Sequence, residues 1–365
     1  MSRRSSLGDR LYRGESGIDF VGRRRTWFIV SGVLILISLA ALGFRGLNLG
    51  IEFQGGAVFS VPNATCSVPD ARDTAAAATG ADVIVTETGA GIVRVQTPPV
   101  EPAQSQDISR VLAEACGVPV TDITTQVVGP TWGAEITAKG IQALAVFLVL
   151  VTIFLAVYFE WRFAVAALIA LAHDILLTVG IYAVTGLQVT PATLIGFLTI
   201  LGYSLYDTVV VFDKVKEETK GITAQSVMSY PEAANRAVNQ VLVRSINTSI
   251  TSLLPVVAII VVGAGLLGAG TLLDLAVALA VGMLAGVYSS IFIATPMAVV
   301  LKMRQPDIKA LDNRVAARRG GSGRRAAESQ EAAAAAVGVA DGPAVETSAG
   351  RQQPKRQPRS KRGKK

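Results

Sequence analysis

The sequence predicts an α-helical membrane protein: a six-span transmembrane bundle with a ferredoxin-like α+β extracytoplasmic domain between spans 1 and 2. The first observation is composition, since 51% of the 365 residues are hydrophobic and only 17% are charged. The second is that the apolar residues form long runs, near or above the ~20 residues needed to cross the hydrocarbon core. The third is a strongly acidic segment that separates the first run from the second.

Six runs are long and apolar enough to be membrane spans. They are residues 27–44, 141–159, 163–188, 190–212, 245–273 and 275–301. Four of these runs contain no charged residue; the third contains only His173 and Asp174, and the fourth only Asp207. The first run follows a basic segment, so a cleaved signal peptide is the alternative for it. We expect a retained span, because this run is longer than most signal-peptide cores.

Charge asymmetry predicts how the spans are oriented. Seven arginines precede the first span, and the loop after span four and the chain's end are basic as well. Residues 46–138, in contrast, contain three arginines against ten carboxylates, so their net charge is −7. By the positive-inside rule, we expect residues 1–26 and both termini in the cytoplasm and the acidic segment on the outer side. The formal net charge of +7 is thereby explained by residues that set the topology, and it indicates no nucleic-acid partner.

The acidic segment has the pattern of a small folded domain. Four strand-forming runs and two helical segments follow in the order β-α-β-β-α-β, which is that of a split-βαβ, ferredoxin-like domain. We expect strands at residues 51–61, 82–86, 91–97 and 122–128, and helices at residues 68–79 and 106–115. Residues 87–90 are expected to form the turn of a hairpin between the two middle strands.

Both cysteines of the chain, Cys66 and Cys116, lie in this domain. On an oxidising outer face they could form a disulfide that closes a loop of ~50 residues and contributes ~2–4 kcal/mol. Two buried free thiols are the alternative, because the sequence does not show whether the two positions meet in space.

The last part of the chain, residues 304–365, is expected to be a disordered, basic cytoplasmic tail. It has no long apolar run and ends in a cluster of lysines and arginines. A solvated tail is the simplest interpretation, and contact with anionic lipid or ribosomal RNA is the alternative.

Ionisable residues inside membrane spans are functional candidates, because placing a charge there costs a few kcal/mol at least. Three stand out: Asp174, Asp207 and Arg244. The topology places Asp207 and Arg244 near the cytoplasmic side of spans four and five, so an ion pair between them is geometrically reasonable. A carboxylate that alternates between an arginine and a proton is a simple proton relay. A static ion pair that fixes helix packing is the alternative.

Polar residues at helical spacing accompany these candidates. The supporting residues are His173, Tyr203, Ser204, Thr208, Asn247, Thr248 and Thr251. Asp174 and His173 are weaker candidates, because a packing hydrogen bond explains them equally well. Gly282 and Gly286 form a GxxxG pattern in span six, with Ser289 and Ser290 a turn further on, and predict close helix packing.

No catalytic apparatus is evident, and we expect neither an enzyme nor a cofactor or metal. The sequence has no P-loop, no Cys/His cluster and no nucleophile elbow. The one enzyme alternative is an intramembrane aspartyl protease, because Tyr206 precedes Asp207 inside a span. That chemistry needs a second intramembrane aspartate, and Asp174 lacks the Gly-x-Gly-Asp setting of that class.

Several motifs together resemble the SecF branch of the SecD/SecF family, within the resistance-nodulation-division superfamily. They are residues 46–56 (GLNLGIEFQGG), 128–135 (VGPTWGAE), 172–174 (AHD), 202–213 (GYSLYDTVVVFD), 244–251 (RSINTSIT) and 286–291 (GVYSSI). The likeness extends from about residue 27 to residue 303. Two departures are Glu52, where the family usually has Asp, and Tyr206, where it commonly has Asn.

The resemblance implies a partner-dependent function in protein export. Such a subunit pairs with SecD in a twelve-span unit of the bacterial inner membrane and works beside the SecYEG channel, with YajC as a further partner. It uses the proton-motive force to promote late steps in the export of a preprotein on the outer side. Asp207 and Arg244 match the positions that the family uses for proton conduction. A small-molecule or lipid exporter of the same superfamily and a non-transporting scaffold subunit are the alternatives.

Overall fold

The computed structural model describes residues 17–87, 91–262 and 270–320. The chain divides into two compact units, residues 1–315 and 316–365. Of the second unit, residues 316–320 are described and are helical. The first unit contains the membrane spans and the α+β domain, and all further description concerns it.

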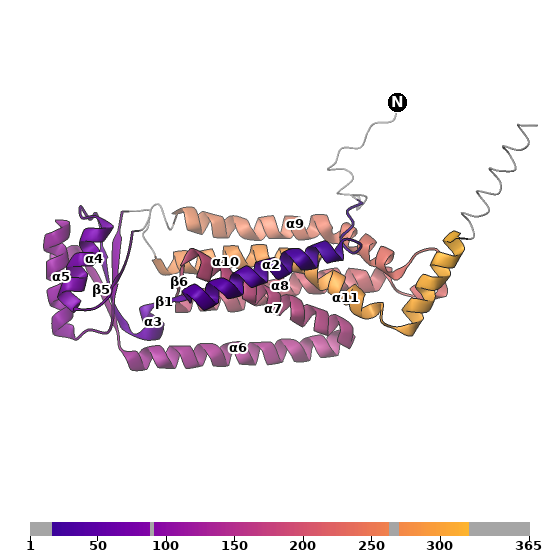
Figure 1. The fold of residues 1–365 in the computed structure, drawn as a ribbon, viewed down its shortest axis with the longest axis horizontal. Coiled ribbons are helices and arrows are strands. Elements are labelled where there is room, and N and C mark those ends of the chain that lie inside the picture. The colour runs from indigo at the N-terminus through magenta and orange to yellow at the C-terminus, as the bar shows by residue number, and fades with distance from the viewer. Residues whose placement is uncertain (1–16, 88–90, 263–269, 321–365) are drawn as a thin grey trace, which may run out of the picture. The chain divides into compact units, whose positions relative to one another are not determined.

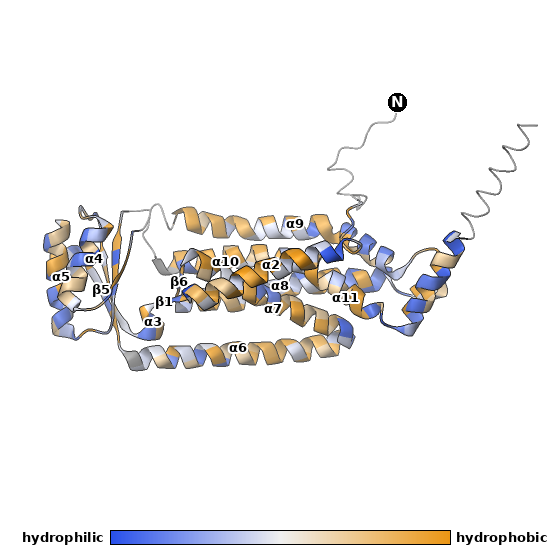
Figure 2. Ribbon diagram, viewed as in Figure 1, coloured by the Kyte–Doolittle hydropathy of each residue, from blue (hydrophilic) through white to orange (hydrophobic). Residues whose placement is uncertain are grey.

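Within the described residues, six helices are long and apolar enough to cross a membrane. They are α2 (Arg24–Arg45), α6 (Pro130–Tyr158), α7 (Trp161–Thr185), α8 (Pro191–Glu218), α9 (Tyr230–Val262) and a last span that contains α10 (Gly270–Ser289), the π-helical turn η4 (Ser290–Ala294) and α11 (Thr295–Lys302). They lie side by side (Figure 1), and apolar residues dominate their length (Figure 2). We call the end where α2 begins and α11 ends the terminal end, and the other end the domain end.

The helices approach closely where small residues meet. On α10, Gly282 faces Ile200 of α8 and Gly286 faces Ser204, so closely that an added Cβ would lie 2.4 Å and 2.9 Å from atoms of these two side chains. Gly180 of α7 meets Ser38 of α2 in the same way. The predicted role of the GxxxG pattern in packing is therefore confirmed, and its partner helix is α8.

A four-stranded antiparallel sheet forms the centre of the α+β domain. Its strands, β2 (Gly56–Val61), β3 (Ile84–Glu87), β4 (Val93–Thr97) and β5 (Thr124–Val128), lie in the order β3-β4-β2-β5. The helices α4 (Val68–Thr79) and α5 (Pro102–Cys116) follow the first and third strands. This is the β-α-β-β-α-β order of a split-βαβ domain. Of the expected hairpin turn, residues 88–90 lie outside the described residues.

Burial and covalent contacts hold this domain together. Phe59 and Val95 of the sheet pack with Ile108 and Leu112 of α5, and all four are almost fully buried. Cys66 and Cys116 are joined by a disulfide, with their Cα atoms 4.4 Å apart. The two positions meet because the loop before α4 runs beside the end of α5.

The helix α4 begins at a well-formed cap. The hydroxyl of Ser67 accepts a hydrogen bond from the backbone N–H of Asp70, whose carboxylate in turn accepts from the backbone N–H of Ser67. This reciprocal pair satisfies backbone groups that a helix start leaves free. The hydrogen bonds from the Ser67 side chain and backbone hold the pKa of Asp70 below its usual range.

Two boundaries and one additional strand differ from the sequence-based expectation. The expected first strand at residues 51–61 begins with a helical turn, α3 (Ile51–Gln54), which ends at Gly55, a residue with the positive φ that glycine adopts readily. The preceding residues instead form β1 (Asn48–Leu49), which pairs in parallel with β6 (Gln188–Val189). The α+β domain also ends earlier than residue 138, because α6 begins at Pro130, where a proline suits a first helical turn.

The expected disorder from residue 304 onward is wrong for its first part. Residues 306–315 are helical, and Ile308, Leu311 and Val315 are buried against the bundle. Their spacing of three and four residues places them on one helix face, which the count of long apolar runs overlooked. Asp312 accepts a hydrogen bond from the backbone N–H of Tyr230, at 3.3 Å. The remainder of the predicted tail, residues 321–365, lies outside the described residues.

The turn between α6 and α7 is tied to the last span at the terminal end. Glu160 accepts hydrogen bonds from Lys302 and Gln305 and forms an ion pair with Arg162 at 2.9 Å. Partial burial tends to raise the pKa of the Glu160 carboxyl, but these hydrogen bonds and positive charges outweigh burial and hold that pKa below its usual range. The carboxylate is therefore ionised at neutral pH, where it pairs with Lys302.

The contact between α2 and α7 is expected to tolerate no added methyl group. In Gly180→Ala the new Cβ would lie 2.8 Å from the Ser38 backbone, so we expect a loss of ~1–3 kcal/mol of stability from overpacking. Thermal unfolding of the detergent-solubilised chain measures this loss. Gly32→Ala on α2 is the matched control, since its Cβ would meet no atom within 4 Å. Equal stability of the two variants would contradict the packing described here.

Candidate functional site

Asp207 lies on the buried face of α8. The buried residues of α8 include Ile200, Ser204, Asp207 and Val211. Their spacing of three to four residues places these side chains on one side of the helix. The Asp207 side chain is 7% exposed, and its Oδ1 accepts a hydrogen bond from Ser245 of α9 at 2.7 Å. Its other oxygen, Oδ2, is buried and has no hydrogen-bond partner among the described residues.

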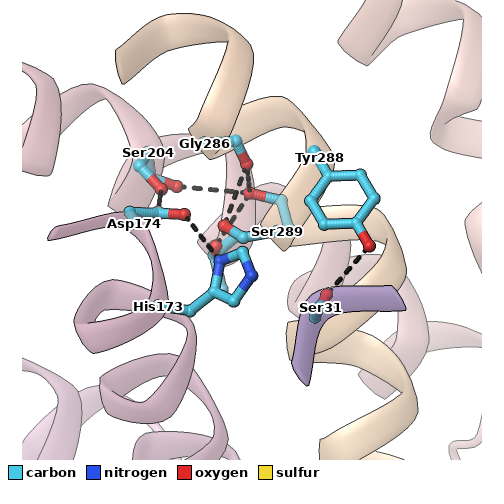
Figure 3. A network of polar contacts seen from close by, with 9 residues as sticks. Ser31, His173, Asp174, Ser204, Gly286, Tyr288 and Ser289 are labelled. Atoms are coloured by element: carbon cyan, nitrogen blue, oxygen red, sulfur yellow. Dashed lines mark hydrogen bonds and ion pairs between the residues drawn. The ribbon is translucent and has the colours of Figure 1, made fainter. Parts of the chain in front are cut away.

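Asp174 is a second buried carboxylate, on α7, with 1% of its surface exposed. Its Oδ2 accepts a hydrogen bond from Ser204 of α8, and its Oδ1 lies 3.6 Å from Nδ1 of His173 (Figure 3). The His173 ring faces the ring of Tyr288, with centroids 5.8 Å apart, and Tyr288 shares a hydrogen bond of 2.8 Å with Ser31 of α2. The polar contacts of Asp174 thus join α7 to α8, and the ring contact of His173 with Tyr288 extends the packing to the last span.

Hydroxyl groups of α8 and the last span connect the surroundings of the two carboxylates. Ser290 shares a hydrogen bond of 2.9 Å with Thr208, the neighbour of Asp207. The same hydroxyl also contacts the backbone oxygens of Ser204, at 3.5 Å, and Gly286, at 2.9 Å. Because Ser204 donates to Asp174, both carboxylates belong to one cluster at the centre of α7, α8, α9 and the last span. We call this cluster the polar site.

The π-helical turn η4 positions Ser290 in this site. A π-turn adds one residue to a helical turn and rotates the side chains that follow it. Ser290 and Thr295 are fully buried here, and the Thr295 hydroxyl donates to the backbone oxygen of Ser290 at 3.2 Å. The irregular turn thus lies directly beside the buried carboxylates, where π-bulges in functional sites often occur.

The expected ion pair between Asp207 and Arg244 is not formed in the described part of the chain. The Arg244 side chain is exposed on α9, whereas the next residue, Ser245, is buried and bonds to Asp207. Successive residues of a helix point about 100° apart, so α9 cannot direct both side chains into the bundle. The positive charge of Arg244 is nevertheless close enough to interact electrostatically with Asp207.

Most of the expected polar stripe on α9 also points away from the site. Asn247 and Thr251 are exposed, Thr248 is half-buried, and the Thr251 hydroxyl donates to backbone oxygens of its own helix. These residues share a helix face with Arg244, and that face of α9 points away from the polar site. On α8, Ser204 and Thr208 lie in the site as expected, and Tyr203 is half-buried beside it.

Ser245 and Ser290 are the site residues whose role the sequence did not show. On α9, Ser245 and Ser249 form a second polar stripe, with the same helical spacing as the stripe that begins at Arg244. The contact with the buried Asp207 shows which of the two stripes faces the site, because Ser245 donates a hydrogen bond to this carboxylate. Ser290 was assigned to packing alone, because serines beside a GxxxG pattern are common at helix contacts.

The polar site brings buried carboxylates and hydroxyl groups together inside the bundle. Asp174 Oδ1 and Asp207 Oδ2 are buried and have no hydrogen-bond partner among the described residues, which is costly inside a membrane protein. Serine and threonine hydroxyls both donate and accept hydrogen bonds and can link such groups. Within the described ranges, no group of three His, Cys, Asp or Glu side chains could hold a metal ion.

The fold and this site define a multi-pass membrane protein with an intramembrane cluster of the kind found on proton and ion pathways. Comparison with known families is specific. Residues 109–304 match the model "Protein export membrane protein SecD/SecF, C-terminal", and residues 40–62 match the SecD/SecF GG motif. The chain therefore belongs to the SecD/SecF family.

Relatives are similar over most of the chain. The protein translocase subunit SecF of Streptomyces coelicolor is 50% identical over 92% of this chain and 90% of its own length. The SecF subunit of Mycobacterium tuberculosis is 42% identical over 86% of this chain and 74% of its own. A crystal structure of SecDF, a translocon-associated membrane protein from Thermus thermophilus, matches with 30% identity and a TM-score of 0.70. That match covers 79% of this chain but only 39% of the longer SecDF chain.

Proposed function

We propose that this chain is an auxiliary, non-catalytic subunit of the Sec protein translocase that uses proton movement to promote late steps of preprotein export. The observation that carries the proposal is the pair of buried carboxylates, Asp174 and Asp207, each of which accepts a hydrogen bond from a serine of a neighbouring helix inside the bundle. Names of close relatives as translocase subunits support the export role. We place the protein in the bacterial inner membrane with both termini in the cytoplasm, in keeping with its basic terminal end.

Asp207 is the proposed proton-binding group. Its Oδ1 is held by Ser245, so the carboxylate keeps its position while the unpaired Oδ2 gains or loses a proton. A change of charge on this carboxylate changes its interaction energy with neighbouring groups, because buried surroundings screen the charge weakly. The groups that feel this change come from α9 and η4, through Ser245 and the neighbouring Ser290. One charge crossing 100 mV gains ~2.3 kcal/mol, enough to shift a helix pair between two positions.

The proposed main partner is SecD, bound along the outward face of α9. This face exposes Arg244, Asn247 and Thr251 within a span, where contact with lipid would be unfavourable. A second six-span half, with polar groups to match, would cover them. The existence of a single-chain SecDF relative supports such a pairing, since this chain matches 39% of it. SecYEG, YajC and the exported polypeptide are the further proposed partners, the last on the outer side.

Replacing the proposed proton carrier tests the function. Asp207→Asn keeps the size of the side chain and its ability to accept from Ser245 but cannot ionise. In cells depleted of the native protein, we expect export of a reporter preprotein to fall to the level of the depleted cells, with normal membrane abundance of the variant. Asp307→Asn, at an exposed position, is the matched control and should support full export. Full export by Asp207→Asn would leave the polar site with a packing role only.

Replacing the outward arginine tests the proposed interface. In Arg244→Ala, co-purification with SecD is expected to weaken about thirtyfold or more, because removing one partner of a buried charge contact costs ~2 kcal/mol or more. We also expect reduced export, as for Asp207→Asn. Arg236→Ala is the matched control on the same helix, since Arg236 is exposed and lies 3.7 Å from Glu218. Unchanged recovery of SecD with Arg244→Ala would argue against this face as the interface.

A further inference from the structure

The segment that precedes the first span is hydrogen-bonded to α9. Asn235 accepts from the backbone N–H groups of Phe20 and Val21, at 2.8 Å and 3.2 Å, and donates to the backbone oxygen of Ile18 at 2.9 Å. Asn239, one turn further along α9, accepts from the N–H of Ile18 and donates to its oxygen. Two carboxamides thus satisfy the backbone of a short segment without regular secondary structure. We call residues 18–21 the strap.

The strap inserts one aromatic side chain between the helices. Phe20 is 2% exposed and belongs to a compact apolar cluster, which we call the plug cluster. Its buried members are Phe20, Val211, Val238, Val241, Leu242 and Ile291. The Phe20 ring also contacts the edge of Phe292, with centroids 5.4 Å apart. Segments far apart in the sequence, namely the strap, α8, α9 and η4, therefore meet at this ring.

The plug cluster lies directly on the terminal side of the polar site. On α8, Val211 follows Asp207 by one turn, in the direction of the terminal end. On α9, which runs the opposite way, Leu242 precedes Ser245 by about one turn. In the last span, Ile291 follows Ser290 immediately, again toward the terminal end. The helices α8 and α9 thus each place an apolar residue of the cluster about one turn nearer the terminal end than the polar site, and Ile291 adjoins Ser290 on the same side.

The way in which Phe20 is held differs from that of the other members of the cluster. Val211, Leu242 and Ile291 are parts of membrane spans, whereas Phe20 lies in the turn that precedes α2, outside any helix. The strap is bonded to α9 by the two asparagines, and its apolar side chains Phe20 and Val21 are buried in the bundle. Because the strap lies outside the spans, its separation from α9 would not require a span to unfold. Its separation would remove an aromatic ring from the layer and leave a passage toward Thr208 and Ser290.

We propose that Phe20 is a hydrophobic plug that the strap holds in place, and that it closes the terminal end of the polar site to water. The functional meaning of this closure rests on the proposed proton role of Asp207: release of the strap gives the site access to the terminal side. Asn235 and Asn239 are positioning residues, because they act on the site only through the backbone that they hold.

Thiol labelling of a cysteine behind the plug tests this proposal. In the full-length chain, Ser290→Cys places a thiol on the far side of the layer, and Cys66 and Cys116 do not react because they form a disulfide. The probe is a small, membrane-impermeant methanethiosulfonate. It is added to vesicles that contain the protein and its partner and that expose the terminal end of the protein to the outside. We expect slow labelling in this background and about tenfold faster labelling when Phe20→Ala is added, since the rate follows the population of the open state.

Matched variants distinguish a plug from a general loss of packing. Phe20→Leu should label as slowly as the background, and Phe44→Ala should not change the rate, because Phe44 is 94% exposed at the domain end of α2. Asn235→Ala should accelerate labelling as Phe20→Ala does, whereas the exposed Asn313→Ala should not. An unchanged rate in Phe20→Ala, or equal acceleration in Phe44→Ala, would overturn the proposal.

The Asn235→Ala variant decides the outcome if Phe20→Ala does not accumulate in the membrane, because Asn235 lies outside the plug cluster. An unchanged rate there would overturn the proposal equally. The labelling rate reports closure of the site whether or not Asp207 moves protons. Failure of the plug is therefore distinguishable from failure of the export function, which the Asp207→Asn assay measures.

Discussion

The close approach of α8 and the last span is the contact on which the polar site depends. Gly282 and Gly286 leave no space for a side chain against Ile200 and Ser204. This brings Ser290 within hydrogen-bond distance of Thr208 and of the Ser204 backbone. In a membrane, where apolar helices gain little from leaving lipid, such close packing and interhelical hydrogen bonds stabilise association. The glycines therefore determine both how the helices pack and which hydroxyls lie beside the carboxylates.

The orientation of α9 in the bundle gives its two faces different roles. Its inward face supplies Ser245 to Asp207 and the asparagines that hold the strap. Its outward face presents Arg244 and the exposed polar residues beyond it. In the proposed complex, α9 lies between the polar site of this chain and a SecD partner. A change in the protonation of Asp207 would then be felt at the interface through a single rigid element.

The amino-acid sequence was sufficient for the parts of the fold that depend on local patterns. Long charge-free runs predicted the six spans, and alternating strand and helix patterns predicted the order of the elements between spans one and two. The helical turn at Ile51–Gln54 was missed because its apolar residues also suit a strand, and the helix at residues 306–315 because its apolar face is short. In both places tertiary packing decided the outcome.

The candidate site was predicted at Asp207 and Ser204 but not in its partners. Burial of an ionisable residue in a span is a strong signal on its own, whereas a helix such as α9 offers two polar stripes with equal spacing. Whether Arg244 or Ser245 faces Asp207 depends on the rotation of α9 about its own axis. That rotation is set by packing at many positions along the helix. The strap was invisible for a similar reason, because two asparagines and a phenylalanine 215 residues away show no local pattern.

Infrared difference spectroscopy of the carboxyl groups tests most directly whether Asp207 gains and loses a proton in the intact protein. The full chain, reconstituted with its partner in lipid, is compared across a pH titration. The account predicts a carboxylic C=O band that changes with pH, is missing in Asp207→Asn and is retained in Asp307→Asn. Spectra of the native protein and Asp207→Asn that are identical at every pH would contradict it.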